Sequence, residues 1–184
     1  MPARLPHLVA ALVGLALAWP VAAVQFNVAE VERHGAWQSM TLNLGEQRLY
    51  RALEGNTYTD AHFSVTFTPG ACEAPWLEMR VDLGERQAES RLANRVPADL
   101  RVDEQTIHSG QAEFRTERGD SGFYVQFDLP EQPLLLDEMR QGELLRLRLM
   151  RGPDDPWFMV FALDGAVEAM ARARTACRDQ GYRS

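Results

Sequence analysis

Apolar and polar residues alternate with a period of two over most of this chain. The clearest alternating runs are residues 63–67, 77–83, 123–129 and 145–149, and weaker runs are residues 37–44, 48–53 and 99–103. Such alternation places apolar side chains on one face of a β-strand and polar side chains on the other. Glycine-rich turns between runs, such as residues 119–122 (GDSG), favour antiparallel hairpins. The sequence therefore predicts a mainly β fold, an antiparallel β-sandwich or partly open barrel.

Some segments depart from this alternation. Residues 157–163 (WFMVFAL) are all apolar, and because a strand without a polar face is buried on both sides, we predict a central strand here. Residues 134–140 follow a proline and end before Gly142, which predicts a short crossover helix. Residues 85–97 are strongly polar, so we expect a long loop or an exposed helical turn there.

A second helix is predicted over residues 165–179, packed on the sheet. Asp164 suits the N-cap position, because its carboxylate can accept the free amide hydrogens of the first helical turn. Ala166, Met170 and Cys177 recur at helical spacing on one face. This apolar face is expected to turn inward, and Cys177 with it.

The first 23 residues differ from the rest of the sequence. Arg4 is followed by twelve residues without a charge (8–19), and then by a proline and small residues (20–23). This order is typical of a cleaved secretory signal peptide, with a retained membrane anchor as the alternative. The apolar run is shorter than the roughly 20 residues that a helix needs to span a bilayer. We predict a signal peptide at residues 1–23, a single β-rich domain at residues 24–184 without a membrane span, and a periplasmic or secreted location.

The two cysteines, Cys72 and Cys177, both follow this signal. In an oxidising compartment an even number of cysteines predicts a disulfide, here between residues 105 positions apart. A metal site needs more ligands than two distant cysteines supply, and a redox pair normally has C-x-x-C spacing. A single nucleophilic cysteine would be unpaired and would need a histidine nearby. We therefore expect a structural Cys72–Cys177 bridge.

The charge balance restricts the kinds of partner. All 19 basic residues are Arg, against 26 acidic residues, and the formal net charge is −7. An acidic surface argues against nucleic acid or an anionic membrane as the partner. We expect the partner to be another envelope or secreted protein.

No motif for catalysis, cofactor binding or metal binding stands out. The histidines of the predicted domain, His34, His62 and His108, have no metal-ligand or triad-like spacing, and we expect ordinary surface or loop positions. Nucleophile-elbow, P-loop, zinc-protease and dinucleotide-binding motifs do not occur. Asp154 and Asp155 fit a solvated turn better than a cation site. We therefore predict no catalytic, cofactor-binding or metal-binding residue and expect a protein that is not an enzyme.

Two groups of residues are candidates for a binding surface. Arg146, Arg148 and Arg151 line or follow the polar face of one predicted strand, where they could contact an acidic partner or pair with acids on the neighbouring strand. The second group consists of tryptophans that begin predicted strands, which favours core packing over an aromatic binding surface. These tryptophans are Trp37, Trp76 and Trp157.

The C-terminal third contains a recognisable order of elements. Residues 144–149 (LLRLRL) form a predicted strand, and residues 161–166 (FALDGA) carry the pattern F-x-L-x-G before the predicted helix and Cys177. This ending resembles that of two exported bacterial families, the invasion-associated locus B proteins and the VasI-like accessory proteins of type VI secretion. Residues 79–82 (MRVD) are also similar to a strand of the VasI-like group.

The resemblance implies a β-sandwich-like periplasmic protein without known catalysis. The chain lacks the extra cysteine pairs expected of the locus B group. It also lacks the cysteine-tryptophan ending of the VasI-like group, because Arg178 follows Cys177. The resemblance assigns no functional residue to this chain.

The leading functional hypothesis is a non-catalytic binding or accessory protein of the cell envelope, for a secretion system or an envelope complex. One alternative is a periplasmic inhibitor or immunity protein against a toxin or lysozyme, since an acidic surface can complement a basic enzyme. Another alternative is an enzyme of unrecognised type, which would need a pocket with converging titratable groups.

Overall fold

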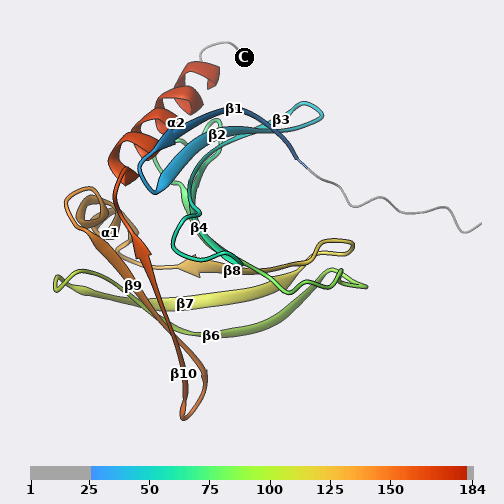
Figure 1. Cartoon of the computed structure of the whole chain (residues 1–184), viewed down its shortest axis with the longest axis vertical. Coiled ribbons are helices and arrows are strands. Elements are labelled where there is room, and N and C mark those ends of the chain that lie inside the picture. Colours follow the sequence, from blue (N-terminus) through green and yellow to red (C-terminus); the bar gives the residue numbers. More distant parts are fainter. Residues whose placement is uncertain (1–25, 182–184) are drawn as a thin grey trace, which may run out of the picture.

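The alternating segments form strands in the computed structural model, which describes residues 26–181 (Figure 1). The strands are β1 (Asn27–His34), β2 (Trp37–Leu44), β3 (Gln47–Glu54), β4 (Ala61–Phe67), β5 (Trp76–Asp82), β6 (Arg91–Val102), β7 (Ile107–Thr116), β8 (Gly122–Asp128), β9 (Leu144–Gly152) and β10 (Asp155–Ala162). The helices are α1 (Gln132–Met139) and α2 (Ala166–Gly181). All strands belong to one antiparallel sheet with the order β1-β2-β3-β4-β5-β8-β7-β6-β9-β10. The prediction of a mainly β fold with a C-terminal helix is confirmed.

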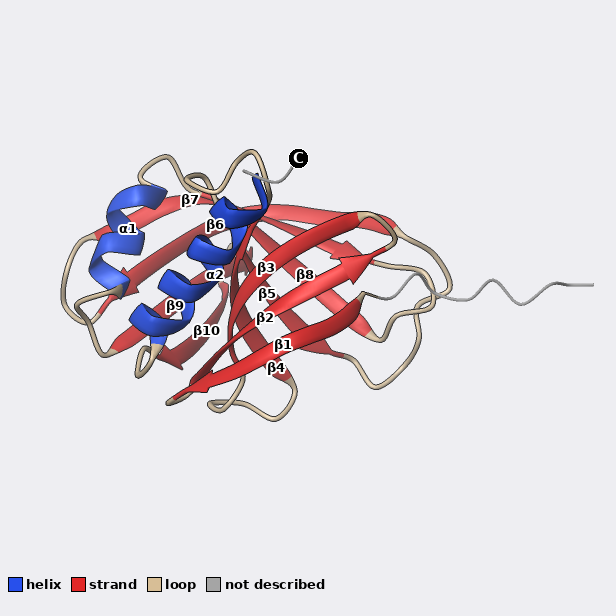
Figure 2. Ribbon diagram, turned by 90° about the horizontal axis from the view of Figure 1, so that it is seen from above, coloured by secondary structure: helices blue, strands red, loops and turns tan. Residues whose placement is uncertain are grey.

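One face of this sheet carries the main core. Phe63, Leu77 and Leu147 are almost fully buried and come from β4, β5 and β9. Helix α2 lies over β1–β4 on this face, and α1 contacts β6 (Figure 2). Met170 and Cys177 on the inner side of α2 belong to the same core, as the helical spacing predicted.

The sheet bends strongly, so that strands at its two ends approach each other. Figure 1 shows β1–β3 above and β6–β8 below, with β4 curving between them. The indole nitrogen of Trp37 in β2 donates a hydrogen bond of 2.8 Å to the carbonyl oxygen of Ala162 in β10. Next to it, the amide of Ala36 donates to the carbonyl oxygen of Asp164 at 3.0 Å. These contacts close one end of the molecule, which makes the fold a partly open barrel.

The prediction of a central strand at residues 157–163 is wrong, because β10 is an edge strand. The outward side chain of Phe158 is 65% exposed. The free edge of β10 is covered by side chains instead of a strand: the amide of Val160 donates to the hydroxyl of Tyr58 at 3.1 Å. Pro156 has no amide hydrogen to leave unpaired. An apolar run can therefore belong to an edge strand when loop side chains cover that edge.

Two strand segments that are exposed on both faces escaped the sequence prediction. The expected loop at residues 85–97 instead contains the start of β6, where residues 91–95 are exposed on both faces and so do not alternate. β1 was missed for the same reason: Val28 and Val31 are exposed, and Glu30 has a positive φ of 53° that interrupts the pairing with β2. Exposure on both faces removes the period-two signal.

The start of α2 also differs from the prediction. Gly165 precedes the first helical residue, and its carbonyl oxygen accepts a hydrogen bond from the amide of Ala169. Gly165 therefore occupies the N-cap position that was assigned to Asp164. Within residues 26–181 neither helix is long and apolar enough to cross a membrane. The predicted signal peptide, residues 1–23, lies outside the described residues.

Candidate functional site

The face of the sheet opposite α2 carries a cluster of charged side chains, which we call the arginine face. It consists of Arg51 on β3, Glu78 and Arg80 on β5, Arg115 on β7 and Tyr124 on β8. Each of these side chains alternates with neighbours that point into the main core, so the period-two pattern places them on the outer face. The strand order brings them together, because β4 lies between β3 and β5, and β8 lies between β5 and β7.

Glu78 lies at the centre of the arginine face. Its side chain is only 5% exposed, and its two carboxylate oxygens each lie 3.5 Å from one guanidinium nitrogen, of Arg51 and of Arg115. Burial raises the pKa of Glu78 above its ordinary value, and the attraction of the nearby arginines offsets this only in part. The same burial lowers the pKa of the Arg51 guanidinium. Glu78 and Arg51 are thus both held where burial raises the free energy of the charged side chain.

Arg80 forms a tighter group at the margin of the arginine face. Its guanidinium donates to Asp120 at 2.7 Å and lies over the ring of Tyr124, 5.7 Å from the ring centre. The Tyr124 hydroxyl donates to the other oxygen of Asp120 at 2.8 Å. Although burial acts to raise the pKa of Asp120, the hydrogen bonds that its carboxylate accepts lower that pKa overall. This group is therefore satisfied within the chain, in contrast to Arg115, whose Nε has no hydrogen-bond partner among the described residues.

A second ionisable pair is enclosed beneath α1. His108 of β7 is 2% exposed, so the expectation of a surface or loop histidine is wrong for this residue. Its Nε2 lies 2.9 Å from a carboxylate oxygen of Glu138 on α1. The pair fixes the short helix to the sheet. A substrate could not reach these atoms without displacing α1.

Replacing Glu138 with Leu is expected to lower the free energy of unfolding by about 1–3 kcal/mol, because buried His108 would lose its partner. Urea unfolding followed by circular dichroism measures this loss. The matched variant Glu138→Gln keeps a side-chain oxygen that can accept a hydrogen bond, and it should lose less. Equal stability of Glu138→Leu and the wild type would show that the pair does not hold α1.

The other histidines do not join this pair. His34 on β1 lies 3.0 Å from the hydroxyl of Ser39, and His62 is on β4. Within residues 26–181 no three His, Cys, Asp or Glu side chains gather in a way that could hold a metal ion.

The three arginines predicted as a contact surface all lie on β9, away from the arginine face. Arg148 pairs with Asp99 on the neighbouring strand β6, and Arg151 pairs with Asp155 at 2.8 Å. Arg146 donates to the carbonyl oxygen of Asp103 at 2.9 Å. Their contacts match the alternative of pairing within the chain. Contact with a partner stays a prediction for these three residues.

The tryptophans do not form one aromatic surface. Trp37 is buried in the main core, and Trp157 packs against the same core. Trp76 packs on the opposite face of the sheet, beside a small cluster that contains Met40 and Leu42. Core packing therefore accounts for Trp37 and Trp157, while Trp76 lies on the same side of the sheet as the arginine face.

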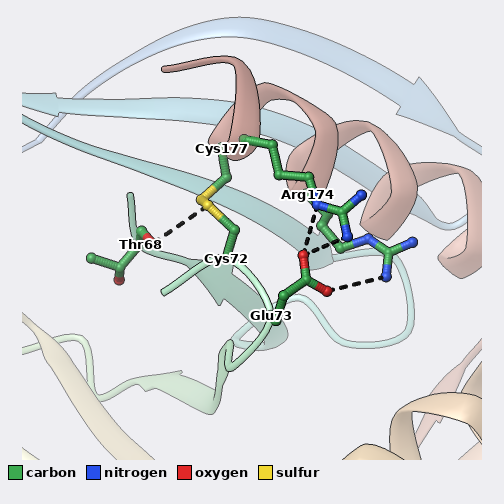
Figure 3. Close-up of a disulfide and its surroundings, with 6 residues drawn as sticks. Thr68, Cys72, Glu73, Arg174 and Cys177 are labelled. Carbon is green, nitrogen blue, oxygen red and sulfur yellow. Dashed lines mark hydrogen bonds and ion pairs between the residues drawn. A yellow bond between two sulfur atoms is a disulfide. The ribbon is translucent and has the colours of Figure 1, made fainter. Parts of the chain in front are cut away.

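The predicted disulfide joins Cys72, in the connection between β4 and β5, to Cys177 on α2 (Figure 3). The two Cα atoms are 5.9 Å apart. Beside the bridge, the carboxylate of Glu73 pairs with Arg178 and lies 3.9 Å from Arg174. The Cys72 sulfur is 3.6 Å from the carbonyl oxygen of Thr68, a contact without a proton because a disulfide sulfur carries none. The bridge and the ion pairs fix the same face of α2 to the same loop.

A cavity of about 330 Å³ lies between the last turns of α2 and strands β1–β3. Its polar lining is already engaged in part: Arg48 donates to Gln180 at 3.0 Å, and Thr41 donates to Glu30 at 2.7 Å. The arginine face is the better candidate because its central groups are less fully bonded.

The fold is similar to that of a solved structure. No protein-family model matches the chain, and no curated protein matches it in sequence. The crystal structure of invasion associated protein B from Bartonella henselae superimposes with a TM-score of 0.54, covering 80% of this chain and 97% of that chain at 16% identity. The resemblance to the invasion-associated locus B proteins that the C-terminal motif indicated is thus confirmed at the level of the fold.

Proposed function

We propose that this protein is a non-catalytic binding protein of the cell envelope, periplasmic or secreted, and that it contacts a protein partner through the arginine face. A disulfide and the lack of a membrane-spanning helix in residues 26–181 are compatible with export. The fold similarity to an invasion associated protein adds support for the class, although it concerns the fold alone.

The observation that carries the proposal is the incomplete bonding of the arginine face. Charged side chains that only stabilise a sheet normally pair closely with neighbours, as Arg148 does with Asp99. On the arginine face, Glu78 and Arg115 lie 3.5 Å apart, beyond the 2.7–2.9 Å or so of a well-formed charged hydrogen bond. Arg115 is also 31% exposed, so a partner can reach it.

Two features favour binding over catalysis. Among residues 26–181, the histidine closest to a carboxylate is His108, which is enclosed beneath α1 and cannot meet a substrate. The arginine face offers guanidinium groups and one buried carboxylate, which suit recognition of charged groups better than proton transfer. An accessory role in an envelope or secretion complex agrees with this arrangement.

Affinity capture from the cell envelope, with cross-linking and mass spectrometry, tests the proposal. We expect one dominant partner with the wild type and its loss with Arg115→Gln. The matched control is Arg148→Gln, which removes an exposed arginine from β9 and should retain the partner. Thermal unfolding first establishes that both variants are folded and have the same unfolding temperature as the wild type.

Three outcomes would count against the proposal: no enriched partner, equal capture by all variants, or loss of the partner with Arg148→Gln alone. The last outcome would move the binding surface to β9. The identity of the captured protein separates an accessory factor from an inhibitor, because a toxin or lysozyme would indicate inhibition.

A further inference from the structure

The arginine face has more hydrogen-bond donors than acceptors. The Nε of Arg115 and the indole nitrogen of Trp76 are buried and make no hydrogen bond to any described residue. Arg115 reaches Glu78 through one terminal nitrogen only, at 3.5 Å. A guanidinium presents five donors in a planar fork that matches two oxygens of a carboxylate, sulfate or phosphate. The exposed part of Arg115, 31% of its side chain, therefore has capacity for an oxyanion that Glu78 does not use.

The charge of the arginine face depends on the protonation of Glu78. The guanidinium groups of Arg51, Arg80 and Arg115 contact three carboxylates, of Glu78, Asp82 and Asp120, while Glu113 pairs with Arg95. The cluster is neutral when these acids are ionised and positive when Glu78 is protonated, although the chain has a net charge of −7. With Glu78 protonated, the positive site attracts an anionic group.

Glu78 competes with an incoming anion for the same arginines. An ionised Glu78 repels a second carboxylate placed beside Arg115, whereas a protonated Glu78 leaves both flanking guanidinium groups free for it. The binding of the anion and the protonation of Glu78 are therefore coupled. Burial already favours the neutral form of Glu78.

We propose that the arginine face binds a carboxylate group of a protein partner, received by Arg115 with support from Arg51, and that Glu78 takes up a proton from solvent as this group binds. This inference rests on the proposed function, since it assigns the carboxylate to the protein partner. The predicted sign is unambiguous: binding strengthens as the pH falls, because the proton is bound together with the anion.

The groups that face Glu78 determine the controls. They are Arg51 from β3, His62 and Ser64 from β4, Arg80 on β5 itself, Tyr124 and Gln126 from β8, and Arg115 and Glu113 from β7. Arginine does not titrate near neutral pH, but histidines do. The variant His62→Gln therefore removes a second possible source of pH dependence.

The test is calorimetric titration of the exported protein with sulfate at about pH 5.5 and about pH 8, since sulfate keeps its charge where a carboxylate would begin to protonate. The wild type should bind more tightly at the lower pH, by up to about tenfold for each pH unit because one proton is linked. Glu78→Gln should bind tightly at both values, without pH dependence. Arg115→Gln should bind at least about tenfold more weakly, and His62→Gln and Arg148→Gln should behave as the wild type.

A second arm replaces sulfate with a pentaglutamate peptide at about pH 8, where its carboxylates are ionised. Tighter binding of the peptide than of sulfate, lost with Arg115→Gln, supports a carboxylate on a protein. Binding of sulfate alone would overturn the assignment to a protein carboxylate. If Glu78→Gln keeps the pH dependence of sulfate binding, the role of Glu78 is wrong. The role is also wrong if His62→Gln loses this pH dependence.

The inference and the proposed function fail separately. If Arg115→Gln loses the captured partner while neither sulfate nor peptide binds, the binding protein stands and the oxyanion chemistry is wrong. If both probes bind as expected and no partner is captured, the anion-binding site is supported and the proposal of a protein partner is contradicted.

Discussion

Replacing Gly165 with Ala is expected to cost at least about 3 kcal/mol of folding free energy. Gly165 has a φ of +84°, a region that costs an L-residue about 1–2 kcal/mol. A Cβ at this position would also overlap the carbonyl group of His34, at the tip of the β1–β2 hairpin. The hairpin cannot move away freely, because the amide of Ala36 is bonded to Asp164. The clash therefore falls on the contact that closes the barrel.

The chain provides a matched control for this prediction. Gly70 has a φ of +85°, but a Cβ there would meet no atom within 4 Å. Gly70→Ala should therefore cost only the backbone term, about 1–2 kcal/mol. Urea unfolding of both variants separates the backbone term from the clash. If the two substitutions destabilise equally, the hairpin and the start of α2 are not in close contact.

The sequence predicted strands well where alternate side chains of the strand are apolar and enter the core. β4, β5, β8 and β9 each send alternate side chains into the core, and each was predicted close to its observed position. β1 and residues 91–95 of β6 have two exposed faces and therefore no alternation. The position of β10 in the sheet also could not be predicted, because hydroxyl groups of a distant loop cover its edge.

The candidate site was harder to predict than the fold. The polar side of each strand was predicted, including the positions of Glu78 and Arg80. However, Arg51, Glu78 and Arg115 are far apart in the sequence. They meet only because β4 pairs with both β3 and β5, and β8 pairs with both β5 and β7. That strand order cannot be predicted from the local sequence around any of these residues. Similarly, nothing near His108 in the sequence indicated that α1 would cover it.

Removing the disulfide by the double substitution Cys72→Ala and Cys177→Ala is expected to cost about 4 kcal/mol. The bridge closes a loop of 105 residues, and the loss of loop-closure entropy in the unfolded chain predicts about 4–5 kcal/mol for this length. The loop spans β5 to β10, so the bridge limits the unfolded state of most of the sheet. Urea unfolding of the oxidised wild type and of the double variant measures the difference.

The slope of the urea transition distinguishes this mechanism from a simple loss of contacts. Without the bridge the unfolded chain is more expanded and exposes more surface, so the denaturant dependence should become steeper. The control is Glu73→Gln, which removes the exposed ion pairs between the same loop and α2 and should change stability by less than about 1 kcal/mol. A double variant as stable as the wild type would mean that packing of the apolar side of α2, and not the covalent link, holds this helix on the sheet. A large effect of Glu73→Gln would mean that the ion pairs of Glu73 carry a substantial part of the attachment.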